Sequence, residues 1–499
     1  MADGAGHGVA GLAGCDGRRG HSVVSALGLA MFALALAGIV LSGLPVYAVL
    51  LAVSAVFAAL GVALGSVDAS LLTALPFRIV GLLEHDLLQA LPLYAFIGAL
   101  LNRLPLAHTL HRVGTHLVRR SRVAPRLSAI GVAALLAPMN GSVGASLHML
   151  SRSVAPAMRR AGTSAQETAA TVCVASTLGV VIPPSLVLLL LGDAMMRAHT
   201  EAVNATHAAV RIVNTQDVVR AAFVPGVLVL LATLAVCWWR GRASTARESI
   251  QDAPTLQERW TGAIVTAAIL ALLAGVAVGW LYAVEAAATG GVVLLVVSVL
   301  RRQLPGSLLR MVLSDTMALT GALFALLVAA TTFSLVLRGF GTDRLITDAL
   351  QSLATHPTAL LLSVLGGMAL CSFVLDAFEM IFLVIPLVMP PVLMSVGDAA
   401  WVAALVLLVL QLGFLLPPVG YALVMSRSVL AEPVGMKALM RSLWPQWLAQ
   451  ALLIAAVLAW PSITRLTRPD EHALSGGAPD AAEIERRMEE AIKAQQAPQ

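Results

Sequence analysis

Oxygen-bearing side chains lie at two places where long apolar stretches of this sequence are interrupted. The first interruption is residues 138–142 (Pro-Met-Asn-Gly-Ser), and the second is residues 371–376 (Cys-Ser-Phe-Val-Leu-Asp). Hard cations bind oxygen ligands, and broken helices inside a membrane offer backbone carbonyls as well. The sequence therefore predicts one ion site that includes Asn140, Gly141 and Ser142, and a second that includes Asp376.

Backbone carbonyls near two double prolines are the remaining candidate oxygens of both sites. Residues 177–185 read Thr-Leu-Gly-Val-Val-Ile-Pro-Pro-Ser, and residues 412–420 read Leu-Gly-Phe-Leu-Leu-Pro-Pro-Val-Gly. Proline removes a backbone donor and glycine unwinds at low cost, so each segment should be a discontinuous helix with free carbonyls. We expect Gly179, Val180 and Ile182 to complete the first ion site, and Gly413 and Leu416 to complete the second.

Four further polar residues near the breaks are candidates for binding substrate. They are Ser176, Thr177, Glu379 and Gln411. Acids within membrane segments are rare and functional by default, and Asp376 and Glu379 share one helix face. Structural alternatives remain open: Asp376 as a helix N-cap, Gly141 and Ser142 as small packing residues, and Gln411 as a bond between helices.

The composition decides the class of protein. Of 499 residues, 59% are hydrophobic and 12% are charged, whereas soluble domains are about half apolar and about a quarter charged. These values exclude a soluble enzyme, a disordered chain and a nucleic-acid binder. The four cysteines lack metal-ligand spacing, and no catalytic motif of a membrane enzyme is present. We therefore predict an all-α polytopic membrane protein that is not an enzyme.

The spans follow from the roughly 20 apolar residues that a membrane helix needs. About ten segments qualify: 23–43, 44–66, 85–101, 168–192, 218–239, 260–280, 284–300, 315–337, 401–425 and 443–463. The segments 127–158 and 358–396 are interrupted near their middles. Because irregular backbone at membrane depth must be enclosed by protein or face a cavity, we predict two re-entrant helical hairpins there.

The interruptions repeat along the chain. Both the double prolines (183 and 417) and the hairpin breaks (Ser142 and Asp376) are 234 residues apart. This predicts two inverted repeats, in which paired broken helices mark a transporter binding site. The predicted parts are a polar extension (1–22), the first repeat (23–240), a cytoplasmic linker (241–259), the second repeat (260–463) and a polar tail (464–499). We expect both hairpins and both broken helices to move together, while the other spans stay fixed.

Arginine placement gives the orientation. Residues 102–126 contain six arginines and no acid, which predicts a cytoplasmic position by the positive-inside rule. Both chain termini would then lie on the opposite, periplasmic side. The same segment is predicted to be an amphipathic arm at the membrane surface, in contact with lipid.

Four stretches resemble one transporter family in the same order. They are residues 175–185, 282–290, 373–386 and 410–421. Over about residues 23–465 the chain resembles the large membrane subunit of tripartite ATP-independent periplasmic (TRAP) transporters. The Leu-Asp-Ala-Phe-Glu form at 375–379 and residues 333–341 are closest to the mannitol/chloroaromatic-compound branch.

The resemblance implies an elevator-type secondary transporter in the bacterial inner membrane. A periplasmic binding protein would deliver an organic acid, such as a dicarboxylate, and a small four-helix membrane subunit would pair with this chain. A sodium gradient would drive import, so Na⁺ is the implied coupling ion. Leu416 stands where the family usually has threonine, which leaves the number of ions open. The alternatives are a self-sufficient ion-coupled carboxylate carrier and a channel.

Overall fold

The computed structural model describes most of the chain as helices. It covers residues 13–68, 70, 73–84, 88, 90–140, 142–183, 185–206, 212–242, 253–351, 356–417, 420–430 and 434–467. These described residues form helices and no strand, which confirms the all-α prediction. Residues 1–12 of the predicted extension and 468–499 of the predicted tail fall outside them, while residues 13–22 belong to the first helix.

Fewer helices reach full membrane length than the sequence predicts. Among the described residues, six helices are long and apolar enough to cross a bilayer, or up to eight if each of two bent pairs counts as one span. Four shorter apolar helices of 10–17 residues explain part of the difference from the predicted ten: Ala26–Ser42, Val284–Leu300, Pro357–Cys371 and Ala399–Gly413. The last two adjoin the interruptions of the second half, where a helix ends partway along its segment.

The elements of the two halves follow one another in the same order. The first half consists of α1 (Ala13–Ser42), α2 (Val46–Ala63), α4 (Leu75–Leu83), α5 (Ala90–Arg103), α6 (Leu106–Leu117), α7 (Ala124–Leu136), the 3-10 turn η2 (Ala137–Asn140), α8 (Val143–Ser153), α9 (Ala155–Arg160), α10 (Ala165–Val181), α11 (Leu186–Thr206) and α12 (Thr215–Arg242). The second half consists of α13 (Leu256–Val278), α14 (Ala283–Leu300), α15 (Gly306–Gly339), α16 (Thr342–Gln351), α17 (Pro357–Cys371), α18 (Ala377–Glu379), the π-helical turn η3 (Met380–Val384), α19 (Ile385–Ser395), α20 (Ala399–Gly413), α21 (Tyr421–Val429), α22 (Met436–Ala459) and α23 (Ser462–Arg465).

The spacing of 234 residues extends beyond the prolines to whole helices. Moved on by 234, the bounds of α7 become 358–370, and α17 spans Pro357–Cys371. In the same way α6 becomes 340–351, beside α16 at Thr342–Gln351. The repeat is therefore a property of the helical framework and not only of two motifs.

The halves differ where one helix replaces two. The 34-residue α15 occupies the register of both α4 and α5. The helix after the first double proline, α11, has 21 residues, whereas α21 has 9. Residues 193–206 are therefore helical and extend past the end of the predicted span 168–192.

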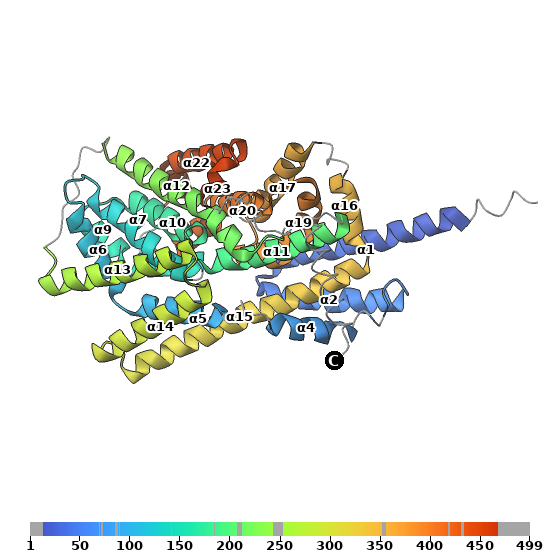
Figure 1. Ribbon diagram of the computed structural model, residues 1–499, viewed down its shortest axis with the longest axis horizontal. Coiled ribbons are helices and arrows are strands. Elements are labelled where there is room, and N and C mark those ends of the chain that lie inside the picture. The colour runs from blue at the N-terminus through green and yellow to red at the C-terminus, as the bar shows by residue number, and fades with distance from the viewer. Residues whose placement is uncertain are drawn as a thin grey trace, which may run out of the picture.

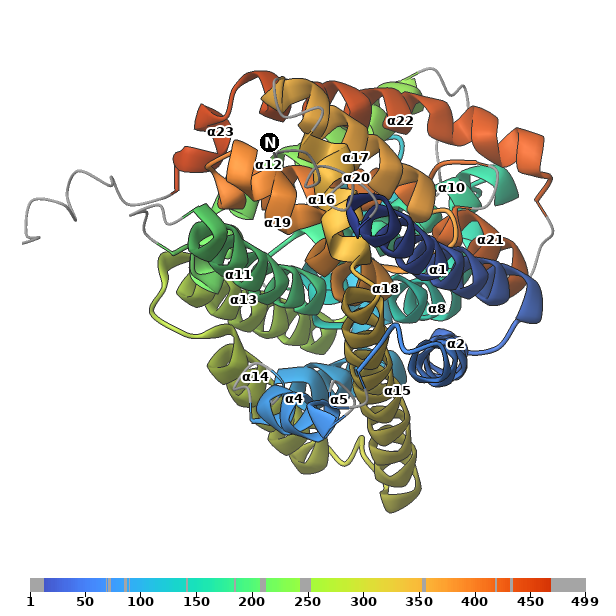
Figure 2. The ribbon, with the colours of Figure 1, turned by 90° about the vertical axis from the view of Figure 1, so that its right-hand side faces the viewer.

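The helices divide into two packed groups, which we call the outer layer and the core body. The outer layer consists of α1, α2, α4, α5, α13, α14 and α15, with α15 packed on α2 and α5. Figure 2 shows α2, α4, α5, α14 and α15 together on one side of the molecule. The core body contains the hairpins and broken helices, with α10 against α7, α8 and α20, and α19 against α11 (Figure 1).

Two closing helices also belong to the core body. Helices α12 and α22 pack on α10 and α20, and Gln446 Nε2 donates to Thr233 Oγ1 at 2.8 Å between them. The Trp401 Nε1–H donates to the Val457 carbonyl at 2.9 Å, joining α20 to α22. Two of the spans predicted to stay fixed thus pack directly on the broken helices.

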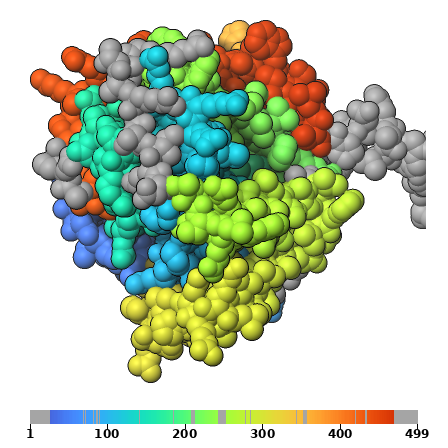
Figure 3. Space-filling model, turned by 90° about the vertical axis from the view of Figure 1, so that its left-hand side faces the viewer, coloured from blue at the N-terminus to red at the C-terminus, as the bar shows by residue number. Residues whose placement is uncertain are grey.

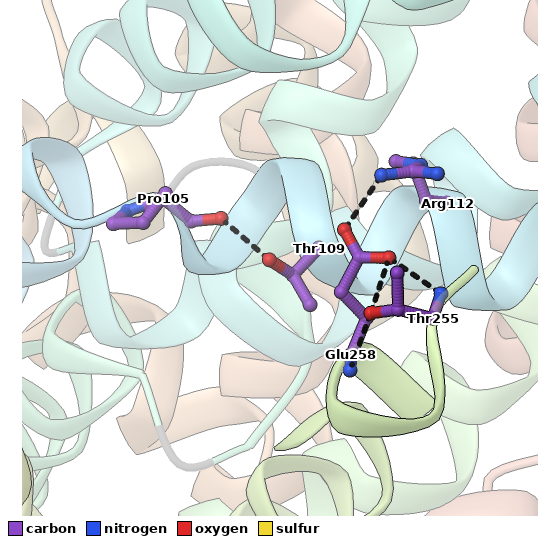
Figure 4. Close-up of polar contacts among 5 residues, drawn as sticks. All are labelled: Pro105, Thr109, Arg112, Thr255 and Glu258. Carbon is purple, nitrogen blue, oxygen red and sulfur yellow. Dashed lines mark hydrogen bonds and ion pairs between the residues drawn. The ribbon is translucent and has the colours of Figure 1, made fainter. Parts of the chain in front are cut away.

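Short amphipathic helices connect the layer to the hairpins. Helix α6 bends by 67° from α5 and packs on both α7 and α13. Arg112 pairs with Glu258 at 2.6 Å, and Glu258 also accepts from the Thr255 backbone amide at 2.8 Å (Figure 4). Figure 3 shows α6 and its neighbours in cyan directly above α13 in yellow-green. Helix α16 packs in the same way on α15 and α19, so each half has one such arm.

Candidate functional site

Each hairpin resumes its helix at a polar N-cap position. Ser142 has extended backbone angles (φ −147°, ψ 156°), and its hydroxyl accepts from the Ala145 amide at 3.1 Å. Asp376, at the repeat-related position, also precedes a helix, and its own amide donates to Glu379 Oε2 at 2.9 Å. Glu379 thereby takes the reciprocal part of a capping box. The capping alternative for the hairpin acids thus agrees with the geometry, while Gly141 lies outside the described residues.

Three buried oxygen atoms near the breaks have no hydrogen-bond partner among the described residues. They are Asn140 Oδ1, Asp376 Oδ1 and Gln411 Oε1. The amide nitrogen of Asn140 is engaged, because it lies 3.3 Å from Ser146 Oγ and 3.6 Å from Met149 Sδ. A buried acceptor without a donor is costly, and a cation would satisfy it. These atoms therefore have the chemistry that a sodium ion requires.

The double prolines change what the preceding carbonyls can do. Pro183 and Pro417 have no N–H to give to the carbonyls of Gly179 and Gly413, four residues earlier. The Gly413 carbonyl accepts from the Leu416 amide at 3.2 Å instead, and the Leu416 carbonyl accepts from the Gly420 amide at 2.9 Å. A carbonyl has two lone pairs, so these oxygens can still accept a second partner.

The first break is closed in a different way. The Val180 carbonyl accepts from Ser185 Oγ at 3.2 Å, and the Ile182 amide donates back to Leu178 at 3.0 Å. Ile182 itself leaves the helix with extended angles (φ −82°, ψ 116°). The carbonyls predicted for the first site therefore lie at the helix end, next to the first hairpin.

At both breaks a glycine allows the broken helix to lie close against a hairpin turn. A Cβ at Gly179 would lie 2.5 Å from the Ala137 carbonyl oxygen, and a Cβ at Gly413 would lie 1.8 Å from Ser372 Oγ. Ala137 begins the turn of the first hairpin, and Ser372 follows α17 in the second. The repeat thus places each glycine of a broken helix on its own hairpin.

Three of the four predicted substrate ligands are buried, and Glu379 is half-buried. Ser176 and Thr177 are fully buried, and their hydroxyls donate to the carbonyls of Cys173 and Val174 in their own helix, each at 2.8 Å. Gln411 Nε2 lies 3.5 Å from Thr177 Oγ1. These two residues are themselves 234 positions apart, so this contact joins the two repeats at their equivalent helices.

A charged cavity lies elsewhere, between α4, α11, α15 and the second hairpin. Its volume is about 360 Å³, and its charged lining residues are Arg78, Asp193, Arg197, Glu201 and Arg338. None of the four predicted substrate ligands lines it. Sequence alone did not indicate this cavity, because all five of its charged lining residues lie outside the predicted spans. The signal was present, since Asp193, Arg197 and Glu201 recur every four residues and share one helix face.

Substitutions at the two residues of the Gln411–Thr177 contact should differ in their effect on sodium-dependent uptake. We expect Thr177→Val to leave sodium-dependent uptake within about twofold of wild type, because the hydroxyl is bonded within its own helix and its contact with Gln411 is long. Gln411→Leu removes an unpaired buried oxygen and should raise the half-saturating sodium concentration by about tenfold or more. Sodium titrations of uptake measure both. Equal effects of the two substitutions would show that the contact between repeats, and not the oxygen, is what matters.

Comparisons with known proteins agree on one kind of transporter. Residues 30–463 match the family model described as "Tripartite ATP-independent periplasmic transporter, DctM component". The C4-dicarboxylate TRAP transporter large permease protein DctM of Pseudomonas aeruginosa is 25% identical over 395 residues, which cover 78% of this chain and 87% of that protein. The namesake protein of Rhodobacter capsulatus is 22% identical, over 77% and 87% of the two chains.

Two further proteins are similar to this chain. The sialic acid TRAP transporter permease protein SiaT of Haemophilus influenzae is 22% identical over 69% of this chain, which spans about half (54%) of that protein. The YdaH transporter of Alcanivorax borkumensis is similar in structure, with a TM-score of 0.53, 17% identity and coverage of 81% of this chain and 91% of that one. This last similarity supports the helical membrane fold alone.

Proposed function

We propose that this chain, which belongs to the DctM component family of tripartite ATP-independent periplasmic transporters, imports an organic carboxylate driven by a sodium gradient. The family is a transporter permease, and the chain is a multi-pass membrane protein. The relatives whose names state a cargo are named for C4-dicarboxylates and for sialic acid, which are all carboxylates. The observation that supports coupling most directly is the set of unpaired buried oxygens on Asn140, Asp376 and Gln411.

The residues at the two breaks fit a sodium ion. At the first break they are Asn140 and the carbonyls of Gly179, Val180 and Ile182, with Ser142 at the hairpin N-cap. At the second they are Asp376 and the carbonyls of Gly413 and Leu416. We add Gln411, which the sequence predicts as a substrate ligand, because its Oε1 atom is also buried without a partner among the described residues. Leu416 provides no side-chain oxygen. The second site would therefore depend more on Asp376 than it would if a threonine at position 416 added a hydroxyl ligand. When bound, the ion would supply the positive charge that offsets a carboxylate cargo in a low-dielectric interior.

We place the motion between the two packed groups. The core body contains both hairpins, both broken helices, α12 and α22, which contact one another extensively. It meets the outer layer mainly through α5 and α15, which pack on the hairpin segments η2, α8, α18 and η3. Sliding of the core body against α5 and α15 would be the elevator step.

The remaining parts of the assembly follow from the family. A periplasmic binding protein would deliver the carboxylate, and a small four-helix membrane subunit would cover the exposed outer layer, as lipid would elsewhere. The arginines of residues 102–126 favour a position of α6 on the cytoplasmic face of the inner membrane. Both termini would then be periplasmic.

The test is reconstitution in liposomes of the purified protein with whatever membrane subunit co-purifies. An inward sodium gradient should drive uptake of a carboxylate from a panel of succinate, pyruvate and gluconate, and collapsing that gradient should stop it. Uptake that requires an added binding protein would establish the tripartite system. Gradient-driven uptake without one would favour the self-sufficient carrier, and passive, non-saturating flux would contradict both.

A further inference from the structure

The charged cavity lies between the outer layer and the core body, which would slide past each other in the proposed elevator step. Arg78 on α4 and Arg338 on α15 come from the outer layer, whereas Asp193, Arg197 and Glu201 come from α11 of the core body. Ile381, Phe382 and Pro386 of the second hairpin complete the lining. This hairpin segment begins at Asp376, so the cavity lies beside the same hairpin as the second candidate ion site.

The charges in the lining are not balanced. Three guanidinium groups face two carboxylates, which leaves one positive charge in excess. Arg197 pairs with Asp193 at 3.0 Å within α11. Arg338 pairs with Glu201 in a fork, with Nη1–Oε1 at 3.0 Å and Nη2–Oε2 at 3.1 Å. The guanidinium of Arg78 makes no hydrogen bond or ion pair with any described residue, so it carries the excess.

This arrangement suits one chemical class of ligand. Arginine binds carboxylates through two parallel N–H···O bonds, and the Glu201 carboxylate shows that Arg338 is placed to do so. A volume of about 360 Å³ falls at the small end of ligand pockets. A small organic acid could therefore occupy the cavity with its carboxylate on Arg338 in place of Glu201.

We propose that this cavity is a receiving site for the cargo, in which Arg78 and Arg338 hold its carboxylate and Glu201 is the group that the carboxylate displaces. The inference rests on the proposed function and deepens it by naming a site apart from the hairpin tips. In the predicted orientation the cavity lies on the periplasmic side, where a binding protein would release its ligand. Displacing Glu201 also breaks an ion pair between the core body and the outer layer, so that cargo binding would free one of the contacts that oppose sliding.

The test uses the sign of the effect on the KM of uptake. Arg338→Gln and Arg78→Gln should each raise the KM for the transported carboxylate by about tenfold or more, because each removes a charged ligand. Glu201→Gln should lower KM by about threefold or more, because it removes the competitor for Arg338. The half-saturating sodium concentration should stay within about twofold in all three variants.

A second pair on the same helix provides the matched control. Arg103 on α5 pairs with Asp315 on α15 at 2.7 Å, with side chains 30% and 47% exposed, against 34% and 47% for Arg338 and Glu201. This pair lies within the outer layer, so Arg103→Gln and Asp315→Asn should leave KM within about twofold. Arg338→Lys keeps the charge without the fork and should fall between wild type and Arg338→Gln.

The outcomes separate this inference from the proposed function. If Arg338→Gln and Glu201→Gln shift KM in the same direction, or if Arg78→Gln leaves it unchanged, the pair is a structural strut and the receiving site is wrong. If the wild type takes up no carboxylate of the panel under a sodium gradient, the proposed function itself fails and the inference fails with it. Detergent-extracted protein amounts and elution profiles show whether each variant is folded.

Discussion

Gly413→Ala should abolish transport, and a second substitution, Ser372→Gly, should restore most of it. An added Cβ at position 413 would lie 1.8 Å from Ser372 Oγ and 2.7 Å from Ser372 Cβ, while the next nearest atom, the Ala369 carbonyl oxygen, is 3.8 Å away. The obstacle is therefore one side chain. Overpacking a tight contact costs about 1–3 kcal/mol, and this clash should reach the upper end of that range or displace the second hairpin from its broken helix.

We expect rescue because the Ser372 side chain makes only a local hydrogen bond among the described residues. Its hydroxyl donates to the Ala369 carbonyl at 2.7 Å within the same helix end, and its backbone is right-handed helical (φ −66°, ψ −7°). Replacing it with glycine should cost about 1 kcal/mol or less. Thermal unfolding in detergent and sodium-driven uptake of Gly413→Ala, Ser372→Gly and the double variant form the double-mutant cycle that measures this coupling.

The equivalent glycine of the first half should behave differently. A Cβ at Gly179 would lie 2.5 Å and 2.7 Å from the carbonyl oxygen and carbon of Ala137, which are backbone atoms, and 3.0 Å from Ala137 Cβ. No side-chain deletion removes that obstacle, so Ala137→Gly should not rescue Gly179→Ala. Rescue at both positions, or at neither, would mean that the hairpins do not rest on the broken helices as the structure shows.

The breaks in the helices could be predicted from sequence because they depend on local residue types. Proline cannot continue the hydrogen-bonding pattern of a helix, and its spacing of 234 residues repeats from one half to the other. Ser142 and Asp376 could likewise be placed at the hairpin turns, since polar residues that begin helices have a recognisable pattern. Apart from the repeat spacing, these features depend on a few neighbouring residues.

The charged cavity could not be predicted in the same way, because its lining comes from four segments far apart in the chain. Arg78, Glu201 and Arg338 meet only after α4, α11 and α15 have packed. The length of α15 was also unpredictable from apolar content, since its 34 residues include Arg310, Asp315 and Arg338. Ser176 and Thr177 show a third limit of the sequence. Their hydroxyls donate to carbonyls of their own helix. Residue spacing alone does not show whether such a hydroxyl binds its own backbone or a ligand.

Asp376→Asn should raise the half-saturating sodium concentration by about tenfold or more, or abolish transport altogether. Asp376 Oδ1 is buried and has no hydrogen-bond partner among the described residues, so a cation is the partner that its charge would suit. Loss of one favourable charge contact worth about 1.4 kcal/mol corresponds to tenfold in affinity. Asparagine is as good an N-cap as aspartate, so the start of the second half-helix should survive the substitution.

Glu379→Gln is the matched control for Asp376→Asn, because it also neutralises one acid of the same capping box. Its Oε atom can still accept from the Asp376 amide, now bonded at 2.9 Å to Glu379 Oε2, so the cap is retained while one charge is lost. The sodium half-saturation should then stay within about twofold of wild type. A shift for Glu379→Gln as large as that for Asp376→Asn would mean that the two acids act through their summed charge. An unchanged sodium dependence in Asp376→Asn would remove Asp376 from the ion site and leave it the capping role that its position at the start of α18 already supports.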